Sequence, residues 1–292
     1  MIPREVLKRI RRIEITTSRI VTDVFSGQYH SVFKGRGMEF DEVRPYEPGD
    51  EIRSIDWNVT ARTGLPYVKK FVEERELTVM LLLDMSASSF FGTAGRLKSE
   101  LAAELCAVLA FSAIRNNDKV GLIIFTDRIE KFVPPRKGLR HVLRVVREAL
   151  YFKPQGKNTD INAALLYLSR VTTRRTVAFI ISDFFAPDFK KKLAVANKRH
   201  DLIAITITDP AEQSLEDVGI LMLDDPETGE SFMIDTSDKR LRENYAEKNK
   251  KRQEEKKYLF RSSGVDLIEV RTDIPYTMSL MKFFRAREKR RN

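Results

Sequence analysis

The chain has 292 residues, of which 42% are hydrophobic and 32% are charged, and its formal net charge is +10 at pH 7. This composition is typical of a soluble globular protein with one large domain and an appendage, or with two domains. The single cysteine, Cys106, excludes an intramolecular disulfide framework and cysteine-rich metal sites, and it indicates a reducing compartment. No apolar run has the length of a signal-peptide core or a membrane span, so we expect a cytoplasmic protein.

The first 75 residues differ in pattern from the rest and are predicted to form an accessory region. Residues 3–25 alternate basic and branched apolar side chains, which predicts one or two amphipathic helices. Residues 26–75 are divided by glycine and proline into short pieces, which predicts a small β-rich or irregular unit that is not helical.

Charged and aromatic side chains surround a Pro48-Gly49 turn within this unit. They are Arg44, Tyr46, Asp50, Asp56 and Trp57. One interpretation is that the aromatic residues pack the unit onto the main domain. The other is a partner-docking surface built around an aromatic anchor.

From residue 76 onward, apolar strands alternate with amphipathic helices. Strands are expected at 77–83, 119–125, 176–181, 202–207 and 265–270, with hairpin partners at 129–133 and at 220–223 with 231–234. Helices are expected at 94–115, 138–150, 188–199 and 238–261, and from about 161 and 276. Strands separated by helices imply right-handed crossovers, and hence a doubly wound α/β fold with a mostly parallel sheet and helices on both faces. We expect this domain to cover 76–284, before a basic tail at 285–292.

Oxygen-bearing side chains follow two of the predicted strands and one loop. Asp84, Ser86 and Ser88 come at alternate positions after the first strand, where a parallel sheet places its functional loops. Thr159 and Asp160 precede a helix whose first turn Asp160 is placed to cap, and Asp183 follows the strand at 176–181. Such oxygens suit a hard cation such as Mg2+. The alternative is structural: the serines cap the following helix and Asp84 accepts backbone hydrogen bonds.

The Asp-x-Ser-x-Ser pattern, the later Thr-Asp at a helix start and the strand ending in Ser-Asp resemble the von Willebrand factor A domain. The resemblance covers 76–284 and implies a von Willebrand A/Rossmann-like sheet with a metal-ion-dependent adhesion site. Carried over by position, it implies Mg2+ (or Mn2+ or Ca2+) at Asp84, Ser86, Ser88, Thr159 and Asp183. In that family an acidic side chain of a partner protein completes the coordination.

The segment 37–57 is similar to the signature of the bacterial domain-of-unknown-function family fifty-eight, whose members join such a segment to an A domain. Their genes often accompany MoxR-type AAA+ ATPases, so the resemblance implies such an ATPase as a partner. Many members carry N-terminal transmembrane helices, which this chain lacks, so membrane attachment is not carried over.

Two classes of function other than protein binding through a metal site fit parts of the sequence, a basic binding protein and an enzyme. A basic nucleic-acid- or anionic-surface-binding protein is the alternative, using the helix at 238–261 and the basic tail. Enzymes fit worse: Ser86 stands where a haloacid-dehalogenase-type phosphatase needs a second Asp, and Asn158 replaces the hydroxyl residue of a phosphate-binding loop. We therefore expect a non-catalytic protein that acts with a MoxR-type ATPase in protein maturation or complex assembly.

Overall fold

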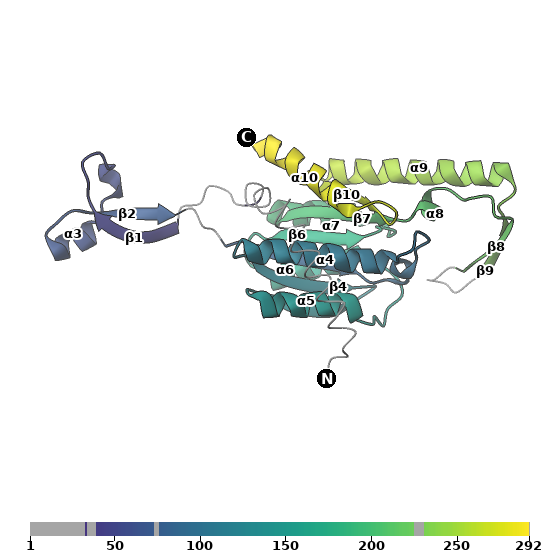
Figure 1. Ribbon diagram of the computed structural model, residues 1–292, viewed down its shortest axis with the longest axis horizontal. Coiled ribbons are helices and arrows are strands. Elements are labelled where there is room, and N and C mark those ends of the chain that lie inside the picture. Colours follow the sequence, from purple (N-terminus) through teal and green to yellow (C-terminus); the bar gives the residue numbers. More distant parts are fainter. Residues whose placement is uncertain (1–32, 34–38, 73–75, 225–230, 292) are drawn as a thin grey trace.

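The centre of the molecule is a six-stranded sheet in the order β10-β7-β6-β3-β4-β5 (Figure 1). The structure is a computed structural model that describes residues 33, 39–72, 76–224 and 231–291. Neighbouring strands of the sheet are parallel except for the edge pair β4 and β5. Helices cover both faces, so the chain has the predicted α/β fold with a mostly parallel sheet.

The elements of this body lie close to their predicted positions. The strands are β3 (Thr78–Asp84), β4 (Lys119–Phe125), β5 (Ile129–Arg136), β6 (Val177–Ser182), β7 (Asp201–Thr208) and β10 (Asp266–Arg271). The helices are α4 (Lys98–Arg115), α5 (Leu139–Tyr151), α6 (Ile161–Val171), α7 (Lys190–Arg199), α8 (Pro210–Gln213), α9 (Lys239–Ser262) and α10 (Tyr276–Arg291). Two boundaries differ: α4 begins at Lys98, after a short 3-10 helix at Ala87–Phe90, and α10 continues through most of the predicted basic tail.

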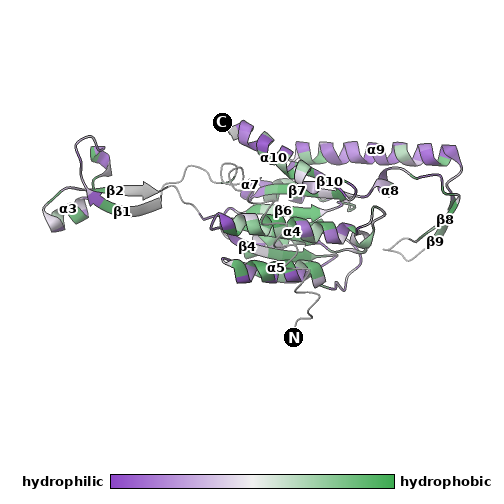
Figure 2. Ribbon diagram, in the orientation of Figure 1, coloured by the Kyte–Doolittle hydropathy of each residue, from purple (hydrophilic) through white to green (hydrophobic). Residues whose placement is uncertain are grey.

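Strand β3 is buried on both faces, which explains its uninterrupted apolar sequence. Val79, Leu81 and Leu83 belong to the core cluster under α4, α5 and α10. Met80 and Leu82 belong to the cluster under α6, α7 and α9. Figure 2 shows the same arrangement, with hydrophobic strands in the middle and the largely hydrophilic α9 outside. Cys106 is fully buried in α4, within the first of these clusters.

The N-terminal part contains a separate small unit, which stands apart from the α/β body in Figure 1. Strand β1 (Glu39–Pro45) pairs with β2 (Tyr67–Val72) in an antiparallel sheet. Between them lies the short helix α3 (Trp57–Thr63), which the expectation of a β-rich or irregular unit did not include. Asp56 caps this helix, accepting from the backbone of Asn58 and Val59, and Gly64 ends it at a φ of 74°. The predicted helices at 3–25 lie outside the described residues.

Two further parts of the structure are Phe33 and a second two-stranded sheet. The Phe33 ring is buried in the α/β core, with its centroid 5.9 Å from those of Phe179 and Phe284. Strands β8 (Ile220–Asp224) and β9 (Ser231–Asp235) form the predicted hairpin. Within the described ranges, no helix combines the length and the apolar composition that crossing a bilayer requires.

Candidate metal centre

The carboxyl ends of β3 and β6 meet at one edge of the sheet, because the two strands are parallel neighbours. Asp84 ends β3 and is only 2% exposed. Its Oδ2 accepts a hydrogen bond from the Ser182 hydroxyl at 2.6 Å, and its Oδ1 accepts one from the Ser86 backbone N–H at 2.9 Å. The Ser182 hydroxyl oxygen also accepts from the Phe184 N–H at 2.9 Å. The first predicted ligand is therefore held rigidly at the sheet edge.

The surroundings of Asp84 disfavour its negative charge. Burial is the main cause, and the nearby charge of Asp183 adds to it, so the pKa of Asp84 rises from 3.8 to about 6. The hydrogen bonds from Ser182 and Ser86 oppose this rise but do not cancel it. A cation beside Asp84 would restore the ionised form.

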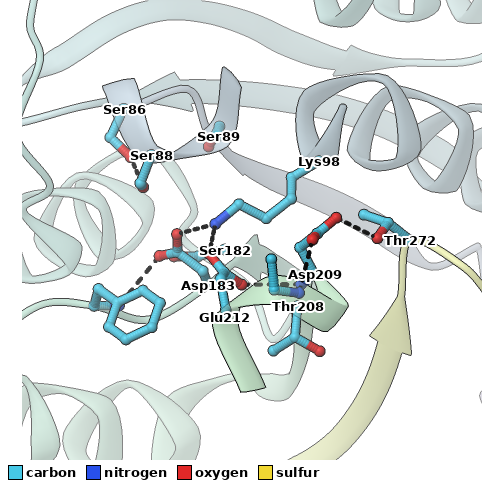
Figure 3. A network of polar contacts seen from close by, with 12 residues as sticks. Ser86, Ser88, Ser89, Lys98, Ser182, Asp183, Thr208, Asp209, Glu212 and Thr272 are labelled. Carbon is cyan, nitrogen blue, oxygen red and sulfur yellow. Dashed lines mark hydrogen bonds and ion pairs between the residues drawn. The ribbon is translucent and has the colours of Figure 1, made fainter. Parts of the chain in front are cut away.

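The two serines of the pattern lie side by side. Their hydroxyl oxygens are 3.2 Å apart (Figure 3). Ser86 precedes the 3-10 helix Ala87–Phe90, but its side chain makes no capping hydrogen bond. The serine hydroxyls are therefore not used as helix caps, although Asp84 does accept the backbone bond that the structural interpretation expected.

The loop that carries Thr159 is attached to the serine loop and to β5. The Ala87 N–H donates to the Lys157 carbonyl at 2.8 Å, which joins the two loops. The Glu130 carboxylate accepts from the Gly156 N–H at 2.7 Å and fixes the middle of the loop. Asp160 caps α6 by accepting from the Ala163 N–H at 3.1 Å, as predicted.

Thr159 lies between these anchors and is partly buried. Its Oγ1 atom is buried and has no hydrogen-bond partner among the residues that the structure describes. Since a buried hydroxyl normally finds a partner, this oxygen is the kind of group that a bound ion or water satisfies.

Asp183 follows β6, and its carboxylate is hydrogen-bonded to a buried ammonium and to a backbone N–H. Oδ1 accepts from the Phe185 N–H at 3.2 Å, and Oδ2 accepts from the Lys98 ammonium at 2.8 Å (Figure 3). The Lys256 ammonium of α9 donates to the Asp183 main-chain carbonyl. Burial acts to raise the pKa of Asp183, but the charge of Lys98 and the hydrogen bonds from Lys98, Ser88 and the Phe185 N–H together lower it.

Two functional-site groups were missed by sequence reasoning. Lys98 carries no motif and approaches Asp183 across 85 positions of sequence. Asp209, which follows β7, accepts from the Thr93 N–H at 2.9 Å and from the Thr272 hydroxyl at 2.6 Å. Its position before Pro210 at a strand end was the available signal, since an Asp before a proline is a common helix start.

The residues at this edge suit a small hard cation. Within the described ranges there is no group of three or more His, Cys, Asp or Glu side chains placed to hold a metal ion. The oxygens here are of a different kind: the Asp84 carboxylate, the adjacent hydroxyls of Ser86 and Ser88, and the unpartnered hydroxyl of Thr159. Neutral oxygens with one or two carboxylates are ligands that Mg2+ accepts together with waters.

The predicted docking residues have mainly local contacts. Arg44 and Asp50 form a paired hydrogen bond of 2.9 and 2.7 Å, and Asp56 caps α3. The Tyr46 side chain is partly buried within the unit, whereas Trp57 is 66% exposed. The interpretation in which Trp57 packs the unit onto the main domain is therefore wrong.

Comparison with known sequences identifies the family. Residues 42–255 match the family described as "Protein of unknown function DUF58". An uncharacterized protein of Mycobacterium tuberculosis is 33% identical over 285 residues, covering 96% of this chain and 89% of that protein. The uncharacterized protein YeaD of Bacillus subtilis is 27% identical over 105 residues, covering 36% of this chain and 24% of YeaD.

The solved structures to which the chain is similar include two that are distantly related in sequence. BatB from Bacteroides thetaiotaomicron is 17% identical with a TM-score of 0.46, covering 73% of this chain and 99% of that chain. The mussel byssus proximal thread matrix protein 1, solved with a zinc-occupied MIDAS motif, is 14% identical with a TM-score of 0.37, covering 46% of this chain and 38% of that chain. On the sequence match, the chain belongs to the DUF58 family.

Proposed function

We propose that this member of the DUF58 family is a non-catalytic interaction module that binds a divalent cation, Mg2+ or a similar ion, and through it an acidic side chain of a partner protein. The ligands are Asp84, Ser86, Ser88 and Thr159, with Asp183 in a supporting position. The residues from 76 to 284 form the metal-binding domain, and those before 76 form an accessory region.

The observation that carries this proposal is the buried, unpartnered hydroxyl of Thr159, on a loop that is hydrogen-bonded to the loop of Ser86 and Ser88. A purely structural cluster would be expected to satisfy its buried hydroxyls internally. With mostly neutral ligands, a bound cation keeps much of its positive charge and can attract a carboxylate.

The partner is proposed from the family resemblance. It is a MoxR-type AAA+ ATPase, or a client that the ATPase remodels, offering an Asp or Glu side chain. The setting is maturation or assembly of another protein, and a cytoplasmic location remains a prediction.

The proposal is tested by titrating Mg2+ and Mn2+ into wild type and Thr159→Val by calorimetry, with thermal unfolding in EDTA. The substitution keeps the shape of the side chain and removes the hydroxyl, so we expect metal affinity to fall by about tenfold or more. The melting temperature in EDTA should stay the same or rise, because an unsatisfied buried hydroxyl is lost.

The matched control is Ser112→Ala, which removes another buried, unpartnered hydroxyl, near the opposite end of α4 from Lys98. It should leave the metal affinity unchanged. If Thr159→Val instead binds metal like the wild type and melts earlier, the hydroxyl is structural and the proposal fails.

Binding to a glutamate-containing peptide and to duplex DNA separates this proposal from a basic nucleic-acid-binding surface. Metal-mediated binding of the peptide should disappear in EDTA. Binding through surface charge should persist in EDTA and weaken steeply with added salt.

A further inference from the structure

Lys98 is an unusual residue to find at the start of a helix. It is the first residue of α4, where the positive end of the helix dipole disfavours a cation. Its side chain is nevertheless only 3% exposed. The ammonium lies 2.8 Å from Asp183 Oδ2 and 2.5 Å from Glu212 Oε1 (Figure 3). Two carboxylates thus hold a buried cation beside a predicted metal ligand.

In this arrangement the Asp183 carboxylate is paired with a cation and with a backbone donor. One of its oxygens accepts from Lys98 and the other from the Phe185 N–H. The Lys98 ammonium is paired with both carboxylates, Asp183 and Glu212. Asp183 therefore already has a permanent counter-ion supplied by the chain itself.

We propose that Lys98 is a positioning residue that keeps Asp183 from direct metal coordination and makes the centre a weak cation site until an acidic partner arrives. This inference rests on the proposed function. A divalent ion near Asp183 meets the fixed like charge of Lys98, whereas the two donors to Asp84, the Ser182 hydroxyl and the Ser86 N–H, are neutral. The ion must then rely on Asp84 and the neutral hydroxyls.

The same charge favours an incoming carboxylate. The Phe185 ring beside the site is partly exposed and has three cations around it: its centroid lies 4.8 Å from Lys256 Nζ, 5.5 Å from Arg252 Cζ and 5.9 Å from Lys98 Nζ. An acidic side chain that approaches the Phe185 ring meets these three cations. Because it binds the cation directly, partner and metal each strengthen the binding of the other.

The test compares Mn2+ and Mg2+ affinity in wild type and four variants, with circular dichroism to verify folding. In Lys98→Met, which removes the charge at similar length, affinity should rise by about tenfold or more. Lys98→Arg keeps the charge and should stay close to wild type. Glu212→Gln leaves Asp183 as the remaining carboxylate paired with Lys98, so the metal affinity should stay the same or fall.

The double variant Lys98→Met/Glu212→Gln removes one positive and one negative charge and leaves the net charge unchanged. It also avoids a partly buried Glu212 that has lost its cation, so it remains informative if Lys98→Met alone does not fold. Tighter metal binding in the double variant isolates the release of Asp183 from any general effect of charge.

Equal or weaker affinity in the double variant, with measurable binding in wild type, overturns the role of Lys98 and leaves the metal site standing. An absence of binding in wild type and in every variant overturns the proposed function, and this inference with it.

Discussion

The sheet edge of the α/β body and the small β1–β2–α3 unit use polar side chains in opposite ways. At the edge, buried groups are joined across long stretches of sequence: 98 positions for Ser182 and Asp84, and 116 for Thr93 and Asp209. In the small unit, Arg44 reaches Asp50 over 6 positions, and Asp56 caps its own helix. Chemistry at the edge therefore depends on the whole fold, while the unit keeps its charges satisfied locally and presents Trp57 to solvent.

The largest loss of stability should come from removing a carboxylate that joins segments distant in sequence. Asp209→Ala leaves the hydroxyls of Thr93 and Thr272 and the part-buried N–H groups of Thr93 and Ala211 without their acceptor. We expect a loss of about 3 kcal/mol in the free energy of unfolding, since hydrogen bonds to a buried charge are among the strongest. Urea unfolding followed by far-UV circular dichroism measures it.

Asp50→Ala is the matched carboxylate in the small unit. It should leave the unfolding midpoint of the body unchanged, because its partners are local and exposed to solvent. Equal losses in the free energy of unfolding for Asp209→Ala and Asp50→Ala would show that the two regions do not differ in how much their carboxylates stabilise the body.

A smaller effect, of opposite sign, is expected for Asp84→Asn in EDTA. Because the folded protein raises the pKa of Asp84 to about 6, its contribution to stability is complete below about pH 3.8 and is lost as the pH rises through 6. Asparagine cannot ionise, so above pH 6 the variant should be more stable than wild type by on the order of 1–3 kcal/mol.

Thermal unfolding of both proteins between pH 4 and 7.5 gives the difference directly. The same variant should bind Mg2+ poorly, since a charged ligand is lost. A variant that is less stable than wild type at pH 7.5 would mean that the backbone bond to Ser86 matters more than the buried charge.

The smallest effect is expected for Trp57→Ala. This side chain is 66% exposed, so the free energy of unfolding of the body should change by less than about 0.5 kcal/mol. Trp57 is also the sole tryptophan of the chain, so its fluorescence in wild type reports only on the small unit. Emission typical of a buried indole would contradict the exposure described above.

The sequence was most informative where a residue's role depends on its immediate neighbours. The uninterrupted apolar run from Val79 to Leu83 was enough to predict the strand at 77–83, and the structure shows that this run is buried on both faces. Asp160 was recognised as a helix cap for the same local reason. The helix α3 had equally local signals in Asp56 and Gly64, and the many glycines and prolines around it concealed them.

The candidate metal centre shows the same difference between residues with local signals and residues whose partners are distant in sequence. Asp84, Ser86 and Ser88 form a short motif and could be proposed directly, and Thr159 and Asp183 followed from their positions after a loop and a strand. Lys98 could not be found, because a lysine in a helical sequence is usually a solvated residue. Its meaning depends on Asp183 and Glu212, which the fold brings to it from 85 and 114 positions away.

The burial of Cys106 makes it practical to measure how the small β1–β2–α3 unit moves relative to the α/β body. Burial raises the pKa of its thiol, and the side chain is fully enclosed in α4, so thiol-directed reagents should not react with the folded chain. A cysteine introduced on the surface of α3, and another on α9, would then carry spectroscopic labels without any change to the native thiol. The distance between two such labels, followed as metal is added, would show whether the accessory unit responds to events at the sheet edge.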